Sequence, residues 1–167
     1  MAHYRESIRN YEILNLGDFM FQSGTTIPNA KLAYKTYGKL NSDASNAIVL
    51  VHGVNGTHES TASVHIEGEG RAISPEKHFI IAPNMFGNGV SSSPSNTPPP
   101  FDGPDFPAVT IYDNVRAQHK LVTEKLGISK LKLVAGSSMG GLQSFHWAAM
   151  YPDMLENVVP ICGTAKC

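Results

Sequence analysis

The amino-acid sequence predicts an α/β fold, a single domain built on a mostly parallel sheet with helices on both faces. The first observation is a set of short apolar runs bounded by turn residues, which are typical of buried parallel strands: residues 47–51, 79–82, 131–135 and 158–161. The second is the helical periodicity of residues 111–126 and 138–150, which lie between these runs. The third is the length of 167 residues, enough for one domain with a buried core, so residues 1–167 are assigned to one unit.

Local signals support these elements. The β-prone segments 19–22 and 31–37 flank the turn-forming stretch 23–29, which predicts a hairpin ahead of the parallel strands. Thr110 and Asp113 have the spacing of a capping box, with Asp in place of Glu, at the start of the first predicted helix.

A proline-rich segment interrupts the alternation of strands and helices. Six of the eleven prolines lie in residues 91–107. Proline lacks a backbone donor, so we expect this segment to form neither sheet nor helix. A rigid surface loop is a better interpretation than a ligand for SH3-type domains.

Composition excludes several classes of partner. Thirteen Lys and Arg against fourteen Asp and Glu leave a net charge of −1, which argues against nucleic acid because its binding needs a basic face. The longest apolar run has five residues, far short of the roughly 20 that span a bilayer. The first six residues lack the apolar core of a signal peptide, and the two cysteines, Cys162 and Cys167, fit free thiols. These features predict a cytoplasmic protein with no membrane partner.

Signatures of bound cofactors and metals are missing from the sequence. The segment Gly87-Asn88-Gly89 lacks the third glycine of a dinucleotide fingerprint, and no phosphate-cradling G-K-[ST] is present. The seven histidines do not show ligand spacing on a helix face. We therefore expect no bound cofactor and no metal.

The strongest chemical signal is the turn between the strand at 131–135 and the helix that follows. Gly136-Ser137-Ser138-Met139-Gly140 satisfies the pattern G-x-S-x-G of a nucleophile elbow. In such a turn the central residue is strained, and Gly136 and Gly140 avoid collisions that β-carbons would cause. Ser138 would then be an exposed nucleophile and the Met139 N–H an oxyanion donor at a helix N-terminus. The bare pattern also fits a glycine-rich turn that only packs closely, but its place between strand and helix favours catalysis.

A second motif supports the same chemistry. The strand at 47–51 leads into His52-Gly53-Val54, and α/β-hydrolases supply their second oxyanion donor just after such a strand. We assign that donor to the Val54 N–H. His52 is interpreted as a core residue that shapes the loop rather than one that transfers a proton.

Several segments together resemble one family. The elbow with its continuation to Gln143 is similar to that of the homoserine O-acetyltransferases and their esterase-like relatives, members of the α/β-hydrolase superfamily. The resemblance covers nearly the whole chain and includes residues 34–41, 56–58, 84–89, 106–119 and 151–153. Residues 91–103 look closer to the hydrolase branch than to dedicated homoserine enzymes.

This resemblance implies an α/β-hydrolase fold, a Ser–Asp–His triad and a ping-pong reaction. The serine would take an acyl group from a small-molecule ester or an acyl donor such as acetyl-CoA and pass it to an alcohol or to water. Acetyl-CoA would then act as a co-substrate rather than a bound cofactor. The family's triad acid and histidine follow two further strands that this sequence lacks.

The residues after Ser138 agree with that gap. His146 lies eight residues along the same predicted helix, roughly 12 Å up its axis at about 1.5 Å per residue, beyond the reach of the Ser138 hydroxyl. Asp153 and Glu156 are better interpreted as surface charges. We therefore expect the C-terminal strands and the triad acid and histidine to be missing, as in the N-terminal part of a longer enzyme, a truncated gene product or a degenerate paralogue.

Two functional interpretations follow. The first is an acyl-transfer enzyme, either an O-acyltransferase or a carboxylic ester hydrolase, impaired in this chain because Ser138 has no base. The second is a non-catalytic remnant or regulatory binding module derived from such an enzyme. The strand at 158–161 would leave apolar surface uncovered, which suggests a homo-oligomer.

Overall fold

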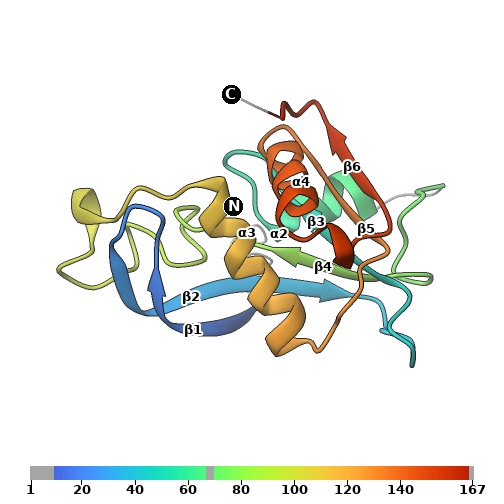
Figure 1. Ribbon diagram of the computed structural model, residues 1–167, viewed down its shortest axis with the longest axis horizontal. Coiled ribbons are helices and arrows are strands. Elements are labelled where there is room, and N and C mark those ends of the chain that lie inside the picture. Colours follow the sequence, from blue (N-terminus) through green and yellow to red (C-terminus); the bar gives the residue numbers. More distant parts are fainter. Residues whose placement is uncertain (1–9, 67–69, 166–167) are drawn as a thin grey trace.

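The computed structural model describes residues 10–66 and 70–165, which form one six-stranded mixed sheet (Figure 1). In spatial order the strands are β1 (Glu12–Met20), β2 (Thr26–Tyr37), β4 (Phe79–Pro83), β3 (Ala47–Val51), β5 (Leu133–Ser137) and β6 (Val158–Ile161). The hairpin β1–β2 and the pair β2–β4 are antiparallel, and the three remaining pairs are parallel. The predicted α/β fold with a mostly parallel sheet is confirmed.

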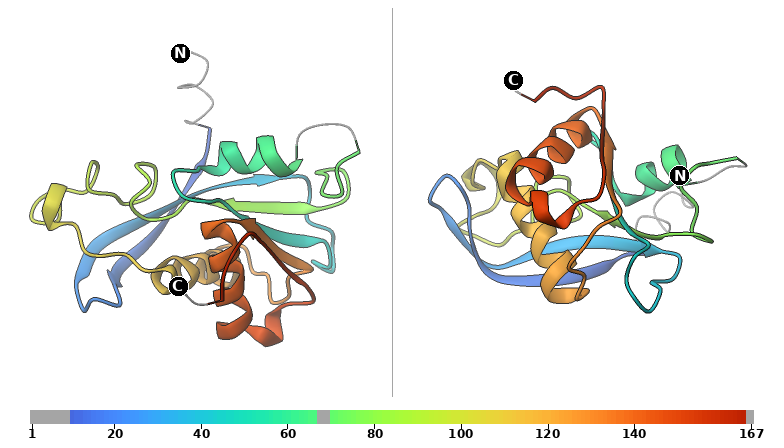
Figure 2. Two further views of the ribbon diagram at one scale, coloured as in Figure 1. Left: turned by 90° about the horizontal axis from the view of Figure 1, so that it is seen from above. Right: turned by 45° about the vertical axis from the view of Figure 1, so that its right-hand side comes forward.

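Helices cover both faces of the sheet, as the left view of Figure 2 shows. One face carries α2 (His58–Thr61), which continues as a π-helical turn, η1 (Ala62–Ile66). The other face carries α3 (Ile111–Lys120), its π-helical extension η3 (Leu121–Lys125), and α4 (Met139–Met150). Two short 3₁₀ turns, η2 (Gly103–Asp105) and η4 (Pro152–Met154), lie in the connections.

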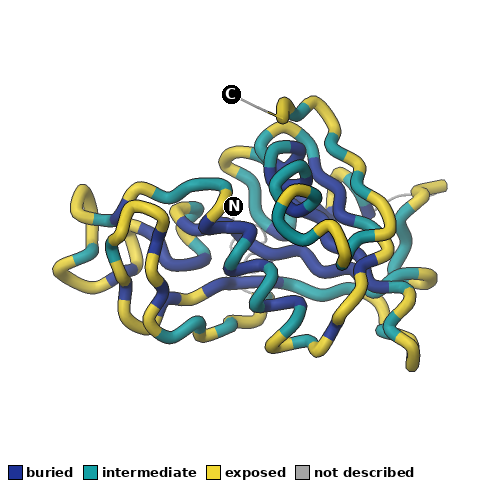
Figure 3. Tube along the Cα trace, viewed as in Figure 1, coloured by how far each residue is buried: buried dark blue, intermediate teal, exposed yellow. Residues whose placement is uncertain are grey.

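The core consists of two apolar layers, one on each side of the sheet. Along β3, Val49 and Val51 face the larger layer, which includes Leu121 and Trp147, whereas Ile48 and Leu50 face the smaller one beneath α2 and η1. Successive side chains of a strand point to opposite faces, so a strand buried on both sides must be apolar at every position. Burial therefore runs along the centre of the sheet, and exposure concentrates in the loops (Figure 3).

The observed elements differ from the predicted ones mainly at their ends. The hairpin strands extend further than expected, because the turn occupies only residues 21–25 and Ile27 is buried and paired with Phe19. Strand β5 starts at Leu133, two residues late, since Leu131 forms only an isolated bridge with Leu155.

The proline-rich segment is only partly at the surface. Residues 91–107 contain no strand and only the short η2, and most of them are exposed, but Ser91, Ser92 and Ser93 at the start of the segment are buried. Ser91 Oγ accepts the Ala33 N–H at 3.0 Å, and Ser92 Oγ accepts the Lys31 N–H at 2.9 Å. These serines satisfy β2 donors beyond the end of its pairing with β4.

The described residues contain no helix long and apolar enough to cross a membrane. Cys162 is exposed and carries a free thiol, whereas Cys167 and the first six residues lie outside the described part of the chain. On β6, Val159 and Ile161 remain 44% and 42% exposed.

The capping box at the start of α3 gives a first test. The buried Asp113 carboxylate accepts the Gln22 N–H at 2.8 Å, the Thr110 N–H at 3.0 Å and the Thr110 hydroxyl at 2.8 Å. We expect Thr110→Ala to lower the free energy of unfolding by about 1 kcal/mol. Asp113→Ala should cost more, about 2–4 kcal/mol, because it also leaves the Gln22 donor without a partner.

Urea unfolding of the variants measures these differences. The control is Asp105→Ala, which removes an exposed carboxylate and should change stability by no more than about 0.5 kcal/mol. Equal losses for the Asp113 and Asp105 variants would contradict the role given to the buried carboxylate.

Candidate active site

The candidate site lies where two neighbouring parallel strands end. β3 and β5 are paired so that Val51 lies opposite Gly136, and their carboxyl ends therefore share one edge of the sheet. The loop after β3 begins at His52, and the turn after β5 leads through Ser138 into α4. The two sequence motifs are thus brought together by strand register.

The approach of these segments is close enough to require glycine. A β-carbon on Gly136 would lie 2.5 Å from the Val51 carbonyl oxygen and 2.8 Å from the Gly140 carbonyl carbon. A β-carbon on Gly140 would collide with the same Val51 oxygen. A β-carbon on Gly136 would also lie 2.6 Å from the Val51 side chain, but the nearest obstacle at both positions is a backbone atom, so side-chain rotation alone does not relieve the collision.

Ser138 occupies a strained backbone conformation. Its φ of 56° and ψ of −122° lie in a region that glycine favours and that other residues rarely adopt. Its N–H donates to the Ile161 carbonyl of β6 at 2.9 Å, which holds the turn. The residue is exposed, and its hydroxyl makes no hydrogen bond to any other residue in 10–66 or 70–165.

The two residues predicted to supply the oxyanion donors line one groove. Val54 and Met139 both line a groove whose walls include the mostly apolar side chains of Met85, Phe86, Val109, Ile111 and Leu142. Gly53, just before Val54, lies against the elbow, since a β-carbon on it would be 3.5 Å from Ser138 Cβ. Within the described part of the chain, neither the Val54 nor the Met139 N–H donates to another residue.

His52 holds the peptide group that carries the Val54 N–H. Its Nδ1 lies 2.8 Å from the Gly53 carbonyl oxygen, which belongs to the same peptide unit as that N–H. Its Nε2 accepts the Met85 N–H at 3.1 Å, so the ring is neutral with its proton on Nδ1. Burial lowers the pKa of His52 and keeps it uncharged. Both nitrogens are thus engaged, which agrees with a shaping role rather than proton transfer.

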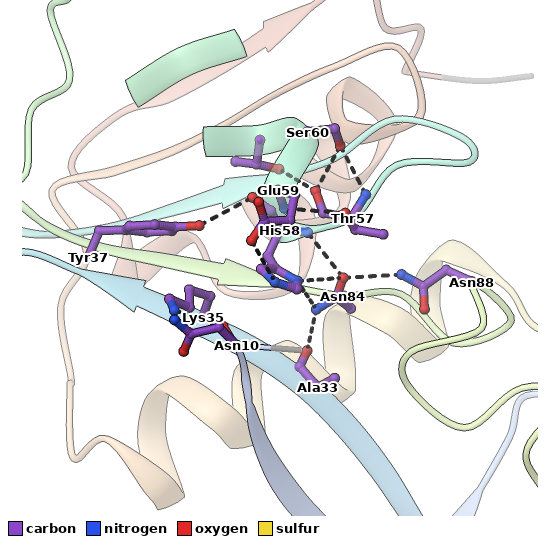
Figure 4. Close-up of polar contacts among 11 residues, drawn as sticks. Asn10, Ala33, Lys35, Tyr37, Thr57, His58, Glu59, Ser60, Asn84 and Asn88 are labelled. Atoms are coloured by element: carbon purple, nitrogen blue, oxygen red, sulfur yellow. Dashed lines mark hydrogen bonds and ion pairs between the residues drawn. The ribbon is translucent and has the colours of Figure 1, made fainter. Parts of the chain in front are cut away.

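A second histidine anchors the far end of the same loop. His58 is buried between Asn84, which receives the His58 N–H at 3.1 Å, and Glu59, whose carboxylate lies 3.3 Å from Nε2 (Figure 4). Asn88 donates to the Asn84 side chain at 3.2 Å and to the Gly56 carbonyl at 3.4 Å. Burial lowers the pKa of His58 and outweighs the neighbouring carboxylate, which acts in the opposite direction.

The other candidates lie away from Ser138. The His146 ring contacts the Leu142 carbonyl oxygen, one turn back along α4, at 3.2 Å, and Asp153 and Glu156 are exposed. His65, which no sequence pattern singled out, lines a second cavity with Gly53 and Val54 because η1 folds over the loop. Among the described residues no cluster of His, Cys, Asp or Glu could hold a metal ion.

The fold and this turn define a class of protein. A strand, a strained serine and a helix, beside a loop from the neighbouring parallel strand, form the arrangement of α/β-hydrolases. A family model described as "alpha/beta hydrolase fold" matches residues 46–166. The chain belongs to this α/β-hydrolase family.

Relatives place the chain more narrowly. It is 44% identical over 156 residues to an ethyl acetate hydrolase from Pseudomonas veronii, covering 93% of this chain and 44% of that protein. It is 40% identical to a homoserine O-acetyltransferase from Zymomonas mobilis, covering 90% and 44%. The solved structure of an acetylester hydrolase from Corynebacterium glutamicum superposes with a TM-score of 0.91 at 40% identity, covering 96% and 46%. The resemblance predicted from the motifs is confirmed, and the chain spans a little under half the length of these relatives.

The strain at Ser138 can be measured as stability. We expect Ser138→Gly to unfold at higher urea concentration than Ser138→Ala, with a difference of about 1 kcal/mol, because only glycine adopts this backbone conformation without cost. The increased freedom of glycine in the unfolded chain reduces the gain but does not reverse it. A Gly variant less stable than the Ala variant would show that the turn is unstrained.

The buried histidines predict a pH dependence of folding. The folded-state pKa of His58 lies below its ordinary value of about 6.5, so the unfolded chain takes up the proton first as the pH falls. The free energy of unfolding should therefore decrease below about pH 6.5, by at most about 1.4 kcal/mol per pH unit for each such group. His58→Gln should flatten this slope in chemical unfolding between pH 7 and 5. It should not abolish it, because burial also lowers the pKa of His52, and an unchanged slope would refute the contribution of His58.

Proposed function

We propose that this chain carries the acyl-transfer site of a serine esterase, with Ser138 as nucleophile and the Val54 and Met139 N–H groups as the oxyanion hole. The observation that carries the proposal is the strained, exposed Ser138 next to a groove lined by Val54 and Met139, whose N–H groups have no partner among the described residues. Backbone strain of this kind concentrates at functional sites. Gly136 and Gly140 serve the site by allowing the close approach that forms it.

The proposed reaction has two steps. The Ser138 oxygen attacks the carbonyl carbon of a small ester, and the negative charge that develops on the carbonyl oxygen is stabilised by the two N–H groups and the α4 N-terminus. The tetrahedral intermediate expels the alcohol and leaves an acyl group on Ser138. Water or an alcohol then attacks this acyl-enzyme and releases the acid or a new ester.

The Ser138 proton limits the rate in this chain. A general base must come within about 3 Å of the hydroxyl, and no other described residue forms a hydrogen bond with it. We propose that acylation of the chain alone is slow, because the proton passes to solvent, yet exceeds the water reaction through the oxyanion hole. This loss is expected in kcat, whereas substrate binding in the groove is retained.

Hydrolysis is the favoured outcome. Ser138 is exposed to solvent, so water has access to an acyl group bound there, and two of the relatives described above are named as acetate or acetyl ester hydrolases. Transfer to an alcohol is the second candidate, supported by the relative named homoserine O-acetyltransferase. In that version a donor such as acetyl-CoA is a co-substrate. The non-catalytic remnant is the less favoured interpretation, because the strained Ser138 and the groove lined by Val54 and Met139 support catalysis.

The remaining predictions concern the setting of the protein. A cytoplasmic location and the absence of a nucleic-acid partner stay predictions. Self-association through the apolar side chains of Val159 and Ile161 also stays a prediction, which sedimentation of the purified chain tests.

Labelling with a fluorophosphonate tests the nucleophile. We expect one adduct, located on Ser138 by peptide mass spectrometry, and its loss in Ser138→Ala. The control Ser95→Ala removes an exposed serine of the proline-rich segment and should label like the wild type. A chain that remains unmodified at Ser138 would favour the non-catalytic remnant.

The same preparations distinguish the two chemistries. With p-nitrophenyl acetate as donor, hydrolysis predicts acetate as the only acetyl product, with or without homoserine. Formation of O-acetylhomoserine would assign the chain to the transferases instead.

A further inference from the structure

We infer that Gln143 is a positioning residue that fixes the position of the two oxyanion donors relative to each other. The inference rests on the proposed function, since it concerns the same Val54 and Met139 N–H groups. Gln143 lies on α4, five residues after Ser138, and is fully buried. Burying an amide is costly unless its donors and acceptors are paired, so its partners indicate what the residue does.

The Gln143 amide contacts both segments that carry a donor. Its Nε2 donates to the His52 carbonyl oxygen at 3.1 Å, which is the backbone group directly ahead of the Gly53–Val54 peptide. The same nitrogen lies 3.5 Å from the carbonyl oxygen of Met139, at the start of α4. A single side chain therefore connects the loop after β3 with the first turn of α4.

A chain of buried donors determines which way this amide points. The indole N–H of Trp147 can only donate, and it reaches the Gln118 Oε1 at 2.9 Å. Gln118 must then present its NH₂ group to Gln143, and that nitrogen donates to Gln143 Oε1 at 2.6 Å. With its oxygen so occupied, Gln143 has to direct its own NH₂ toward the His52 carbonyl.

This relay gives the oxyanion hole a support that the elbow glycines do not provide. The glycines allow β3 and α4 to approach each other, but the absence of a β-carbon provides no attractive interaction that would hold them at a fixed distance. The hydrogen bond from Gln143 to the His52 carbonyl supplies that attraction. The His52 ring in turn fixes the Gly53–Val54 peptide, because its Nδ1–H donates to the Gly53 carbonyl. Because a misplacement of about 1 Å can reduce a rate about 100-fold, alignment of the two donors is a sensitive property.

Two substitutions separate positioning from packing. Gln143→Met keeps the volume but removes the donor, and should lower the rate constant of Ser138 acylation by p-nitrophenyl acetate about 10- to 100-fold with little change in KM. Gln143→Glu keeps the acceptor for Gln118. Its carboxyl can donate to the His52 carbonyl only while protonated, and burial raises the pKa of such a group. The acylation rate constant of this variant should therefore fall as the pH rises through the ionisation of the introduced carboxyl group. The wild type should show no such decrease in its pH–rate profile.

The matched control is Ser144→Ala. Ser144 is the next residue on α4 and is equally buried. Its hydroxyl donates to the Gly140 carbonyl at 2.9 Å, and within the described part of the chain it makes no hydrogen bond to the loop after β3. This variant should lose stability while retaining the acylation rate and KM of the wild type. If Ser144→Ala lowered the acylation rate as much as Gln143→Met, the effect of Gln143 would be due to packing alone, and the inference would be wrong.

Hydrogen exchange tests the support without using activity. The Gly56 N–H bonds to the Gly53 carbonyl at 3.1 Å within the loop, so its exchange reports how firmly the loop is held. We expect at least about tenfold faster exchange at Gly56 in Gln143→Met than in wild type or Ser144→Ala. Unchanged exchange, or faster exchange with unchanged acylation, would overturn the inference. Faster exchange in a chain whose wild type is never acylated would support the positioning role and refute the proposed function instead.

Discussion

The arrangement at this site depends on the contact between the end of β3 and the turn from β5 into α4. The Val51 carbonyl oxygen occupies the space that β-carbons of Gly136 and Gly140 would need. With side chains at these positions the two segments would have to separate, and Val54 and Met139 would no longer line one groove. The glycines therefore allow the close contact because they have no β-carbon. The backbone strain of the turn is located at Ser138.

Buried polar groups then convert this close approach into a defined geometry. His52, Gln143 and Asn84 each use their side chains to bind backbone groups in or beside the loop that carries Val54: the Gly53 carbonyl, the His52 carbonyl and the His58 N–H. Within a dry core such groups are stabilising only when they are paired, so each one favours a single arrangement of the backbone around it. Burial also lowers the pKa values of His52 and His58, which links the integrity of the loop to their neutral form. An acid–base group on the nucleophile is a different requirement, and these histidines do not meet it.

Much of the fold could be predicted because its signals are local. The strands at 47–51 and 158–161 have the predicted ends, and the capping box of Thr110 and Asp113 forms in both directions. The hairpin was predicted too short, since pairing between Phe19 and Ile27 outweighs the turn propensity of the residues around it. The burial of Ser91 was not predicted either, because it depends on a distant residue: the Ser91 hydroxyl accepts the Ala33 N–H of β2, 58 residues away. Propensity describes a residue and its neighbours and contains no information about distant backbone donors.

The amino-acid sequence was sufficient to specify the class of fold, the elbow around Ser138 and the loop that carries Val54, because each of these depends on residue types at short, regular spacing. What only the folded molecule decided is how these parts are held together. The relay from Trp147 through Gln118 and Gln143 to the His52 carbonyl joins residues up to 95 positions apart, and no sequence pattern indicated that they are connected. The direction of the hydrogen bonds in this relay is fixed by the Trp147 indole, which can only donate. The indole is brought to Gln118 by packing between segments that are distant in sequence, and such packing exists only in the tertiary structure.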